Sequence, residues 1–284
     1  YMAALLVILI QAPVFYWNAT HGWVSFRFHL GDRTGSGLGQ PNLSQVIDYL
    51  ATMAVLMSPV LFLSLFRLPW LTPKSPDESR AIGLSSSIYL TSTLAWAVIA
   101  AYVYVYFHWN VVAYAGLAPI AYRLLGPRVG WLHVAFGLIV VTVGLVSYTL
   151  TPTSLFGYRD LGAAASYGWP TLATEVRAVQ QANPGTFLAA TRYTYAAQLG
   201  FELHDADVAA FNQTLSQNDF WWDKAAHKGQ DAIIIADQAA QSTIDEARPH
   251  FASVQKLSDV PARDAFGNTV WTFEIWLGRG YDGN

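Results

Sequence analysis

The chain contains no cysteine and little charge. Without cysteine, neither a disulfide bond nor a zinc site with thiolate ligands can form, and the redox state of the compartment cannot be inferred. Charged residues make up only 12% of the 284 residues, whereas soluble domains have about 25%. Hydrophobic residues reach 53%, and the mean hydropathy is +0.28. This composition predicts that part of the chain lies in lipid.

A basic surface and a metal-ligand pattern are absent as well. The formal net charge is -3 and the isoelectric point is near 6.1, which argues against nucleic-acid binding. The seven histidines show no HxH or HExxH spacing, so no metal site is predicted. No basic segment and cleavage site of a signal peptide precede the first apolar run. We therefore predict no metal, no cofactor and no nucleic-acid partner.

Long apolar runs are confined to the first half of the chain. Three of them reach the length of about 20 residues that a bilayer requires, and two shorter ones complete the set. Helix is the state that satisfies the backbone of each in lipid. The predicted spans lie near residues 1–17, 46–66, 86–107, 109–125 and 131–150.

The distribution of lysine and arginine predicts an orientation. The loops RLPWLTPKSPDESR and RLLGPR are basic, whereas the turn FHWN has neither lysine nor arginine. Basic short loops usually face the cytoplasm. We expect residues 18–45, the turn at 107–110 and everything after about residue 150 on the outer side, although Arg27 and Arg33 weaken this assignment.

Residues 155–284 have the pattern of a water-soluble domain in which helices and strands alternate. Such alternation predicts a small α/β layer. The segment DAIIIAD is apolar throughout, which is typical of a strand covered on both faces. The predicted helices are 170–183, 193–203 and 239–248, and the predicted strands are 186–191, 207–211, 231–237 and a closing pair joined around Gly267–Asn268. The predicted organisation is a multi-pass α-helical membrane region, 1–154, followed by an extracytoplasmic α/β domain, 155–284.

Several motifs stand along the chain in the order PVFYWNATHGWVSFRF, HWN, GW, TRYTYAAQLGFEL, NDFWW, GQDAIIIAD and WLGRGYDG. In this order they resemble the second half of bacterial family 39 glycosyltransferases, membrane enzymes related to protein O-mannosyltransferases and lipid A aminoarabinose transferases. The resemblance covers nearly the whole chain.

The resemblance implies a GT-C fold that transfers a sugar from a polyprenyl-phosphate donor, with inversion, to a lipid, glycan or protein acceptor. The reaction would take place on the outer face of the bacterial cytoplasmic membrane. The catalytic aspartate of the family, in its first external loop, has no counterpart here. We therefore expect the catalytic residues upstream of Tyr1, and the chain to be a carboxyl-terminal fragment that is inactive alone.

The stretch PVFYWNATHGWVSFRFHLGDR, residues 13–33, combines groups suited to such a donor. A guanidinium at the membrane surface can bind a phosphate, and aromatic faces can stack on a sugar ring or an acyl chain. An aromatic belt with a snorkelling arginine is the alternative, and it applies most to the tryptophans. The substrate-binding candidates are Trp17, Asn18, His21, Trp23 and Arg27, with His29 and Arg33 also available to a phosphate.

Two further pairs are candidates for substrate binding. His108 and Asn110 lie in the turn HWN, which we expect on the same face as the first stretch, but we favour Asn110 as the cap of the following helix. Arg192 and Tyr193 follow a predicted strand end, where α/β layers expose ligand-binding groups. Packing between the domain and the membrane would explain that pair equally well.

Two functions of different classes fit these observations. The first is the carboxyl-terminal part of a polyprenyl-phosphate-dependent glycosyltransferase. The alternative is a non-catalytic membrane protein whose external α/β domain binds a ligand or a partner. Asp205, Asp207 and Asp219 could be read as paired carboxylates, but such residues are common in loops, so we do not predict catalysis there.

Overall fold

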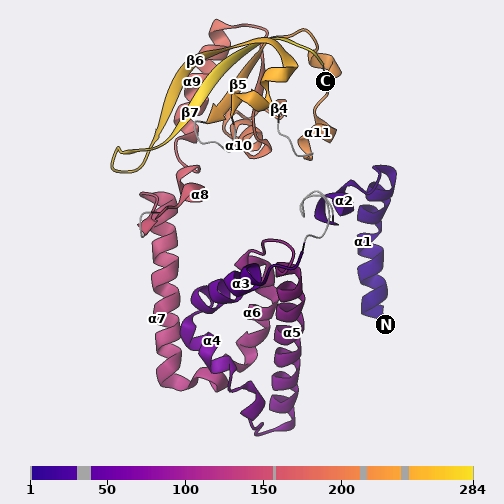
Figure 1. Ribbon diagram of the computed structural model, residues 1–284, viewed down its shortest axis with the longest axis vertical. Helices are drawn as coiled ribbons and strands as arrows, with labels where there is room; N and C mark the ends of the chain where they lie inside the picture. Colours follow the sequence, from indigo (N-terminus) through magenta and orange to yellow (C-terminus); the bar gives the residue numbers. More distant parts are fainter. Residues whose placement is uncertain (1, 31–39, 156–157, 212–215, 238–242, 284) are drawn as a thin grey trace. The chain divides into compact units, whose positions relative to one another are not determined.

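The computed structural model describes residues 2–30, 40–155, 158–211, 216–237 and 243–283 (Figure 1). The chain divides into two compact units, Tyr1–Val140 and Val141–Asn284. Each unit is described by itself.

The described part of the first unit is helical. Its α-helices are α1 (Met2–Thr20), α2 (Val24–Leu30), α3 (Leu43–Leu56), α4 (Pro59–Leu65), α5 (Pro76–Ala100), α6 (Val111–Leu117) and α7 (Ala121–Thr149), the last of which continues into the second unit. Three 3-10 turns lie between them: η2 (Leu68–Trp70), η3 (Phe107–Asn110) and η4 (Ala118–Ile120).

Two stretches of the described chain are long and apolar enough to cross a membrane, namely Pro76–Ala100 and Phe107–Thr149. A third is added if α3 and α4, bent by 113° at their junction, count as one broken span. Leu94, Leu138 and Leu145 are each more than 60% exposed. Apolar side chains exposed to this extent along a helix are suited to contact with lipid. The structure thus supports membrane association, while the count of five spans stays a prediction.

The predicted span at 46–66 is interrupted, which corrects the expectation of one continuous helix. Ser58 has φ +86° and separates α3 from α4. The next residue is Pro59, whose ring disfavours helical geometry in the residue before it. Ser58 is also buried. The break therefore has a local cause that was visible in the sequence.

Helix α5 begins ten residues before the predicted span at 86–107 and ends at Ala100. Its start is set by Ser75, whose hydroxyl accepts a hydrogen bond from the Glu78 backbone N–H at 3.2 Å, while the Glu78 carboxylate accepts from the Lys74 backbone N–H. Such reciprocal bonds are characteristic of a helix start. The Glu78 carboxylate also pairs with Arg123. The loops predicted to be cytoplasmic are thereby joined to each other.

The predicted spans 109–125 and 131–150 correspond to one stretch in which α6, η4 and α7 follow each other directly. Within this stretch Gly126 leaves helical geometry, with φ 67° and ψ 172°, just before Pro127. Glycine adopts this geometry without the steric cost that a Cβ would bring. The helical path is therefore kinked at Gly126.

The second unit contains a five-stranded mixed sheet in the order β4-β3-β5-β7-β6. Strands β3, β4 and β5 are parallel, and β7 pairs antiparallel with both β5 and β6. The strands of the unit are β1 (Ser154–Leu155) and β2 (Tyr158–Arg159), which pair with each other, and β3 (Phe187–Ala190), β4 (Val208–Ala210), β5 (Ala232–Asp237), β6 (Phe251–Arg263) and β7 (Thr269–Tyr281), which form the five-stranded sheet. Its helices and turns are α8 (Leu161–Ala164), α9 (Trp169–Ala182), α10 (Tyr193–Leu203), α11 (Asn218–Trp221), η5 (Ala225–His227), η6 (Ile244–Glu246) and η7 (Arg248–His250).

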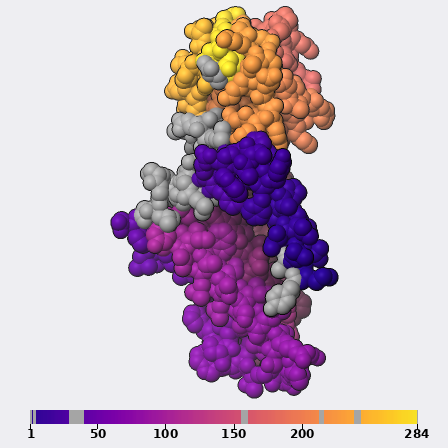
Figure 2. All heavy atoms as spheres, turned by 90° about the vertical axis from the view of Figure 1, so that its right-hand side faces the viewer, coloured from indigo at the N-terminus to yellow at the C-terminus, as the bar shows by residue number. Residues whose placement is uncertain are grey.

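The sheet is buried on both faces. On one face α9 and α10 pack over a core that includes Leu172, Leu199 and Ile233. On the other face the segments between the strands contribute Trp222 and Ile244 to a second core. All six residues of β5 are buried, which confirms the prediction of a strand covered on both sides. In the space-filling view the part of this unit that contains the sheet, salmon to yellow, is closely packed (Figure 2).

Most of the predicted elements of this unit are confirmed, and one is wrong. Helices α9 and α10, strands β3, β4 and β5, and the β6–β7 hairpin around Gly267–Asn268 stand where the sequence placed them. The helix predicted at 239–248 is wrong in its described part, which forms the 3-10 turns η6 and η7; residues 239–242 lie outside the described residues. Ile244 and Ala247, three residues apart, are buried there, and Pro249 follows. That spacing aligns side chains on one face of a 3-10 turn.

The carboxyl end of α7 belongs to the second unit. The Tyr167 hydroxyl donates to the Ser147 carbonyl at 2.8 Å, and the Ala265 backbone N–H donates to the Leu150 carbonyl at 2.8 Å. These bonds join the helix end to the sheet unit. They explain why the compact unit begins at Val141, before the boundary of 155 that composition suggested.

Candidate functional site

The candidates near the amino end lie on a helical hairpin formed by α1 and α2. Asn18 is 1% exposed, and its side chain closes the turn. Its amide donates to the Val14 carbonyl at 3.0 Å, and its Oδ1 accepts from the Ser25 backbone N–H at 3.1 Å. The geometry therefore supports a positioning role for Asn18 rather than direct contact with a ligand.

Trp17 and His21 form a stacked pair on the same hairpin. Their ring centroids are 4.3 Å apart with an interplanar angle of 12°. His21 Nδ1 lies 2.8 Å from the Trp17 carbonyl oxygen and 3.1 Å from the Thr20 hydroxyl. The imidazole of His21 is thus held against the end of α1, while His21 as a whole remains exposed.

Trp23 lies in the turn between α1 and α2, and Arg27 lies near the start of α2. Gly22 and Trp23 both have positive φ, of 66° and 59°. A Cβ on Gly22 would lie 2.6 Å from Arg27 Nη2, so the end of the Arg27 side chain lies against the turn and would have to shift if a side chain were added there. Arg27 is exposed, and the Trp23 ring meets Phe26 edge-on at 5.4 Å. Of the remaining candidates in this stretch, the side chain of His29 and all of Arg33 lie outside what is described.

Asn110 is fully buried in the helical unit and does not cap the helix that follows it. Its side chain makes no cap bond to α6, which corrects the preferred sequence interpretation. Instead, its Oδ1 accepts from the Ser92 hydroxyl at 2.6 Å, and its amide donates to the Thr93 hydroxyl at 3.0 Å. Asn110 therefore links η3 to α5. His108 in the same turn is exposed and stacks against Tyr106 at 5.6 Å.

Arg192 and Tyr193 lie at the carboxyl end of β3, as the sequence predicted for a strand end. They face different cavities. Tyr193 is 55% exposed and lines a cavity of about 580 Å³. Arg192 lines a different cavity, of about 730 Å³. The guanidinium carbon of Arg192 is 5.6 Å from the centroid of the Tyr195 ring. The chain therefore separates these two candidates rather than bringing them together.

A buried pair next to Arg192 was missed by the sequence analysis. The Tyr195 hydroxyl donates to Asp237 Oδ2, and the two residues are 4% and 2% exposed. Burial raises the pKa of the Tyr195 hydroxyl, and the bonded carboxylate of Asp237 raises it further. The available signal was the aspartate that closes the apolar segment DAIIIAD, since a charged group at the end of a buried strand requires a partner.

This pair stands at a switch point in the sheet. Strand β3 lies between β4 and β5, so the chain moves to one side of β3 to form β4 and then crosses to the other side to form β5. In such sheets ligands bind outside the carboxyl ends of the strands at the point where the direction reverses. Arg192 follows the end of β3, and Asp237 ends β5.

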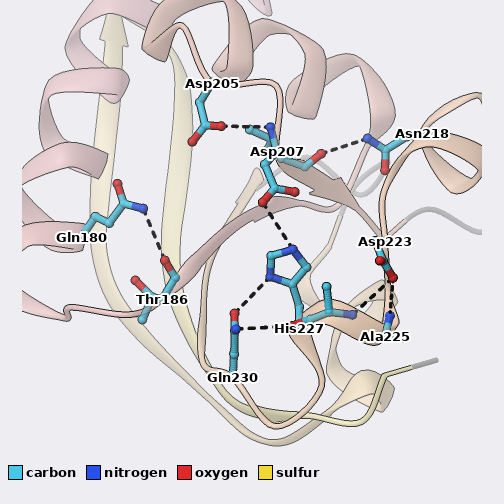
Figure 3. Close-up of polar contacts among 11 residues, drawn as sticks. Gln180, Thr186, Asp205, Asp207, Asn218, Asp223, Ala225, His227 and Gln230 are labelled. Carbon is cyan, nitrogen blue, oxygen red and sulfur yellow. Dashed lines mark hydrogen bonds and ion pairs between the residues drawn. The ribbon is translucent and has the colours of Figure 1, made fainter.

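The aspartates Asp205, Asp207 and Asp219 have separate local partners in the structure. Asp205 Oδ1 accepts from the Asp207 backbone N–H at 2.9 Å, and Asp207 Oδ2 lies 3.3 Å from His227 Nε2. Both contacts are drawn as dashed lines in Figure 3. Asp219 accepts from the Ser216 backbone N–H at 2.8 Å and lies 3.9 Å from Lys224 Nζ. These contacts are those of turns and of partly buried side-chain pairs.

No group of three or more potential ligands suitable for a metal ion occurs among the residues that the structure describes. Comparison with family models, with curated proteins and with solved structures found no match to the chain.

Proposed function

We propose that the chain acts as part of a membrane glycosyltransferase that moves a sugar from a polyprenyl-phosphate donor to an acceptor on the outer face of the cytoplasmic membrane. In this proposal five segments cross the membrane, the α/β unit lies outside, and the catalytic carboxylate is supplied from outside this sequence. The ordered motifs of the chain and its apolar helices support the proposal.

The observation that carries the proposal is the position of Arg27. Its side chain is exposed on α2, the short helix that follows the apolar helix α1, and the rings of Trp23 and Phe26 in the same stretch are exposed as well. A cation next to aromatic surface at the end of an apolar helix suits a lipid-linked phosphate at the membrane surface. Asn18 and His21 would hold the turn that presents Arg27 to the donor.

The test measures sugar transfer from a polyprenyl-phosphate sugar in membranes that contain the complete enzyme. Arg27→Ala is expected to lower kcat/KM about ten- to a hundredfold, because a charge-assisted hydrogen bond to the donor phosphate is lost. Arg27→Lys keeps the charge and should recover part of the activity. Arg80→Ala, a matched change at a side chain that is 82% exposed and pairs only with Asp77 among the described residues, should leave kcat/KM unchanged. Equal activity of Arg27→Ala and the parent enzyme would remove Arg27 from the donor site.

A second candidate is a non-catalytic membrane protein whose α/β unit binds a ligand. The cavity of about 730 Å³ beside the carboxyl end of β3 favours it, since this volume lies in the range of small-molecule sites. Transfer activity that depends on Arg27 would exclude this candidate.

A further inference from the structure

The cavity beside the carboxyl end of β3, between α8, α9, α10 and Trp271 of β7, combines one cation with uncharged polar groups and aromatic rings. Arg192 is the only lining residue with a full charge among those described. Among the described residues, its guanidinium makes no direct ion pair with a carboxylate; it rests over the ring of Tyr195, whose hydroxyl bonds to Asp237. An arginine placed in a concave site without an acidic partner is suited to an anionic group of a ligand.

Two helices begin at the same cavity. Trp169 is the first residue of α9, and Thr194 and Tyr195 lie in the first turn of α10, and all three line the cavity. Neither helix has a side chain that caps its amino end. The N–H groups of such first turns and the helix dipoles favour negative charge. The preference for an anion is thus shared by Arg192 and the two helix starts.

The rest of the lining is amphipathic. Ser166, Thr194 and Gln198 offer hydroxyl and amide groups, while Trp169 and Trp271 contribute aromatic surface. Trp271 Nε1 itself is buried behind this surface and has no acceptor within the described residues. Hydrogen-bonding groups beside aromatic surface match a sugar ring, which has hydroxyls at its edge and C–H groups on its faces.

We propose that this cavity binds a saccharide that carries one negative group, a phosphate or a carboxylate, with Arg192 on the anion. All the residues belong to the second unit, so this inference does not depend on the glycosyltransferase proposal or on Arg27.

The experiment measures binding by isothermal titration calorimetry to the full chain in lipid nanodiscs, with glucose 6-phosphate, glucuronic acid, glucose and inorganic phosphate as probes. Glucose 6-phosphate and glucuronic acid are expected to bind at least about tenfold more tightly than glucose, because the charged contact is lost in the neutral sugar. Glucose 6-phosphate should also bind more tightly than inorganic phosphate. Equal binding of glucose 6-phosphate and inorganic phosphate would overturn the recognition of the sugar ring.

Variants place the effect at this cavity. Arg192→Gln should reduce the affinity for glucose 6-phosphate to that for glucose, and Arg192→Lys should retain part of the difference. Arg248→Gln removes one charge from the same unit at a side chain that is 53% exposed and paired with Asp245, and it should bind like the parent. Near-ultraviolet circular dichroism checks that Arg192→Gln is folded. If Arg192→Gln does not fold, Gln198→Ala provides a second test, because it is expected to weaken binding of both charged sugars. A folded Arg192→Gln variant with parental affinity, or no binding of either charged sugar to the parent chain, would overturn the proposal.

Discussion

The Thr151 hydroxyl lies 2.8 Å from Asp264 Oδ2 and joins the segment after α7 to the turn between β6 and β7. Asp264 also organises that turn, because its Oδ1 accepts from the backbone N–H groups of Phe266 and Asn268 at 2.9 Å each. Asp264 as a whole residue is 7% exposed. One side chain thus fixes the hairpin and ties it to the end of the apolar helix.

Stability should therefore fall in acid through Asp264. Burial raises the pKa of its carboxyl, but the hydrogen bonds from Thr151, Asn268 and the turn backbone lower it more, so the pKa lies below its usual value. A group with a lowered folded pKa stabilises the fold fully above the unfolded value of about 3.9 and loses this contribution as the pH falls through the folded pKa.

Thr151→Val tests this contribution by thermal unfolding at two pH values. At pH 7 the variant should melt about 2–4 °C below the parent, because one hydrogen bond to the ionised carboxylate is lost. In acid the difference should shrink as the pH falls through the lowered folded pKa of Asp264 and the carboxylate becomes protonated. Thr174→Val is the control, since the Thr174 hydroxyl is exposed and bonds only to Pro170 of its own helix among the described residues. A difference between parent and Thr151→Val that is constant with pH would contradict the assignment.

The start of α9 should tolerate no side chain at Gly168. This residue has φ +81°, and an added Cβ would lie 2.4 Å from the Ala262 Cβ and 2.7 Å from its Cα. Gly185 has the similar φ of +83° with open space around it. Gly185→Ala should cost about 1–2 kcal/mol of unfolding free energy from backbone strain alone, and Gly168→Ala should cost clearly more, because β6 must also move. Equal losses in chemical denaturation would show that α9 does not pack against Ala262 as described.

Removal of the Tyr195 hydroxyl should weaken the fold at the switch point. Tyr195→Phe deletes a donor to the buried carboxylate of Asp237, which is expected to cost about 1.5–3 kcal/mol. Tyr193→Phe makes the same chemical change two residues earlier at a ring that is 55% exposed, and it should cost less than about 0.5 kcal/mol. Similar unfolding free energies for both variants would be evidence against the buried pair.

The α/β unit was largely predictable because its elements depend on local patterns. The run DAIIIAD, the helical periodicity that ends at Ala182 and the turn at Gly267–Asn268 each predict their own structure. The segment at 243–250 had a helical composition, yet burial of Ile244 and Ala247 against the sheet selects tighter turns. That preference comes from tertiary packing, which the composition of the segment does not reveal.

The apolar segments of the helical unit were predictable from hydropathy, but the breaks between its helices and the hydrogen-bond partners of its buried side chains were not. Ser58–Pro59 and the start at Ser75 carried local signals that a search for apolar windows passes over. The partners of Asn110 could not be inferred in the same way, because Ser92 and Thr93 lie on another helix. Among the site candidates, Asn18 and Asn110 proved to be buried connectors, whereas Arg27 and Arg192 remain available for binding.

The bend between α3 and α4 also bears on how the protein is made. At 1.5 Å per residue, the 14 residues of α3 extend about 21 Å and the 7 residues of α4 about 10 Å. Neither reaches the roughly 30 Å of a hydrocarbon core. A nascent chain passing through a translocon would therefore gain little by releasing either piece into lipid by itself. Biosynthetic insertion of this region should wait until α5 has emerged from the ribosome, so that the three helices leave the translocon together.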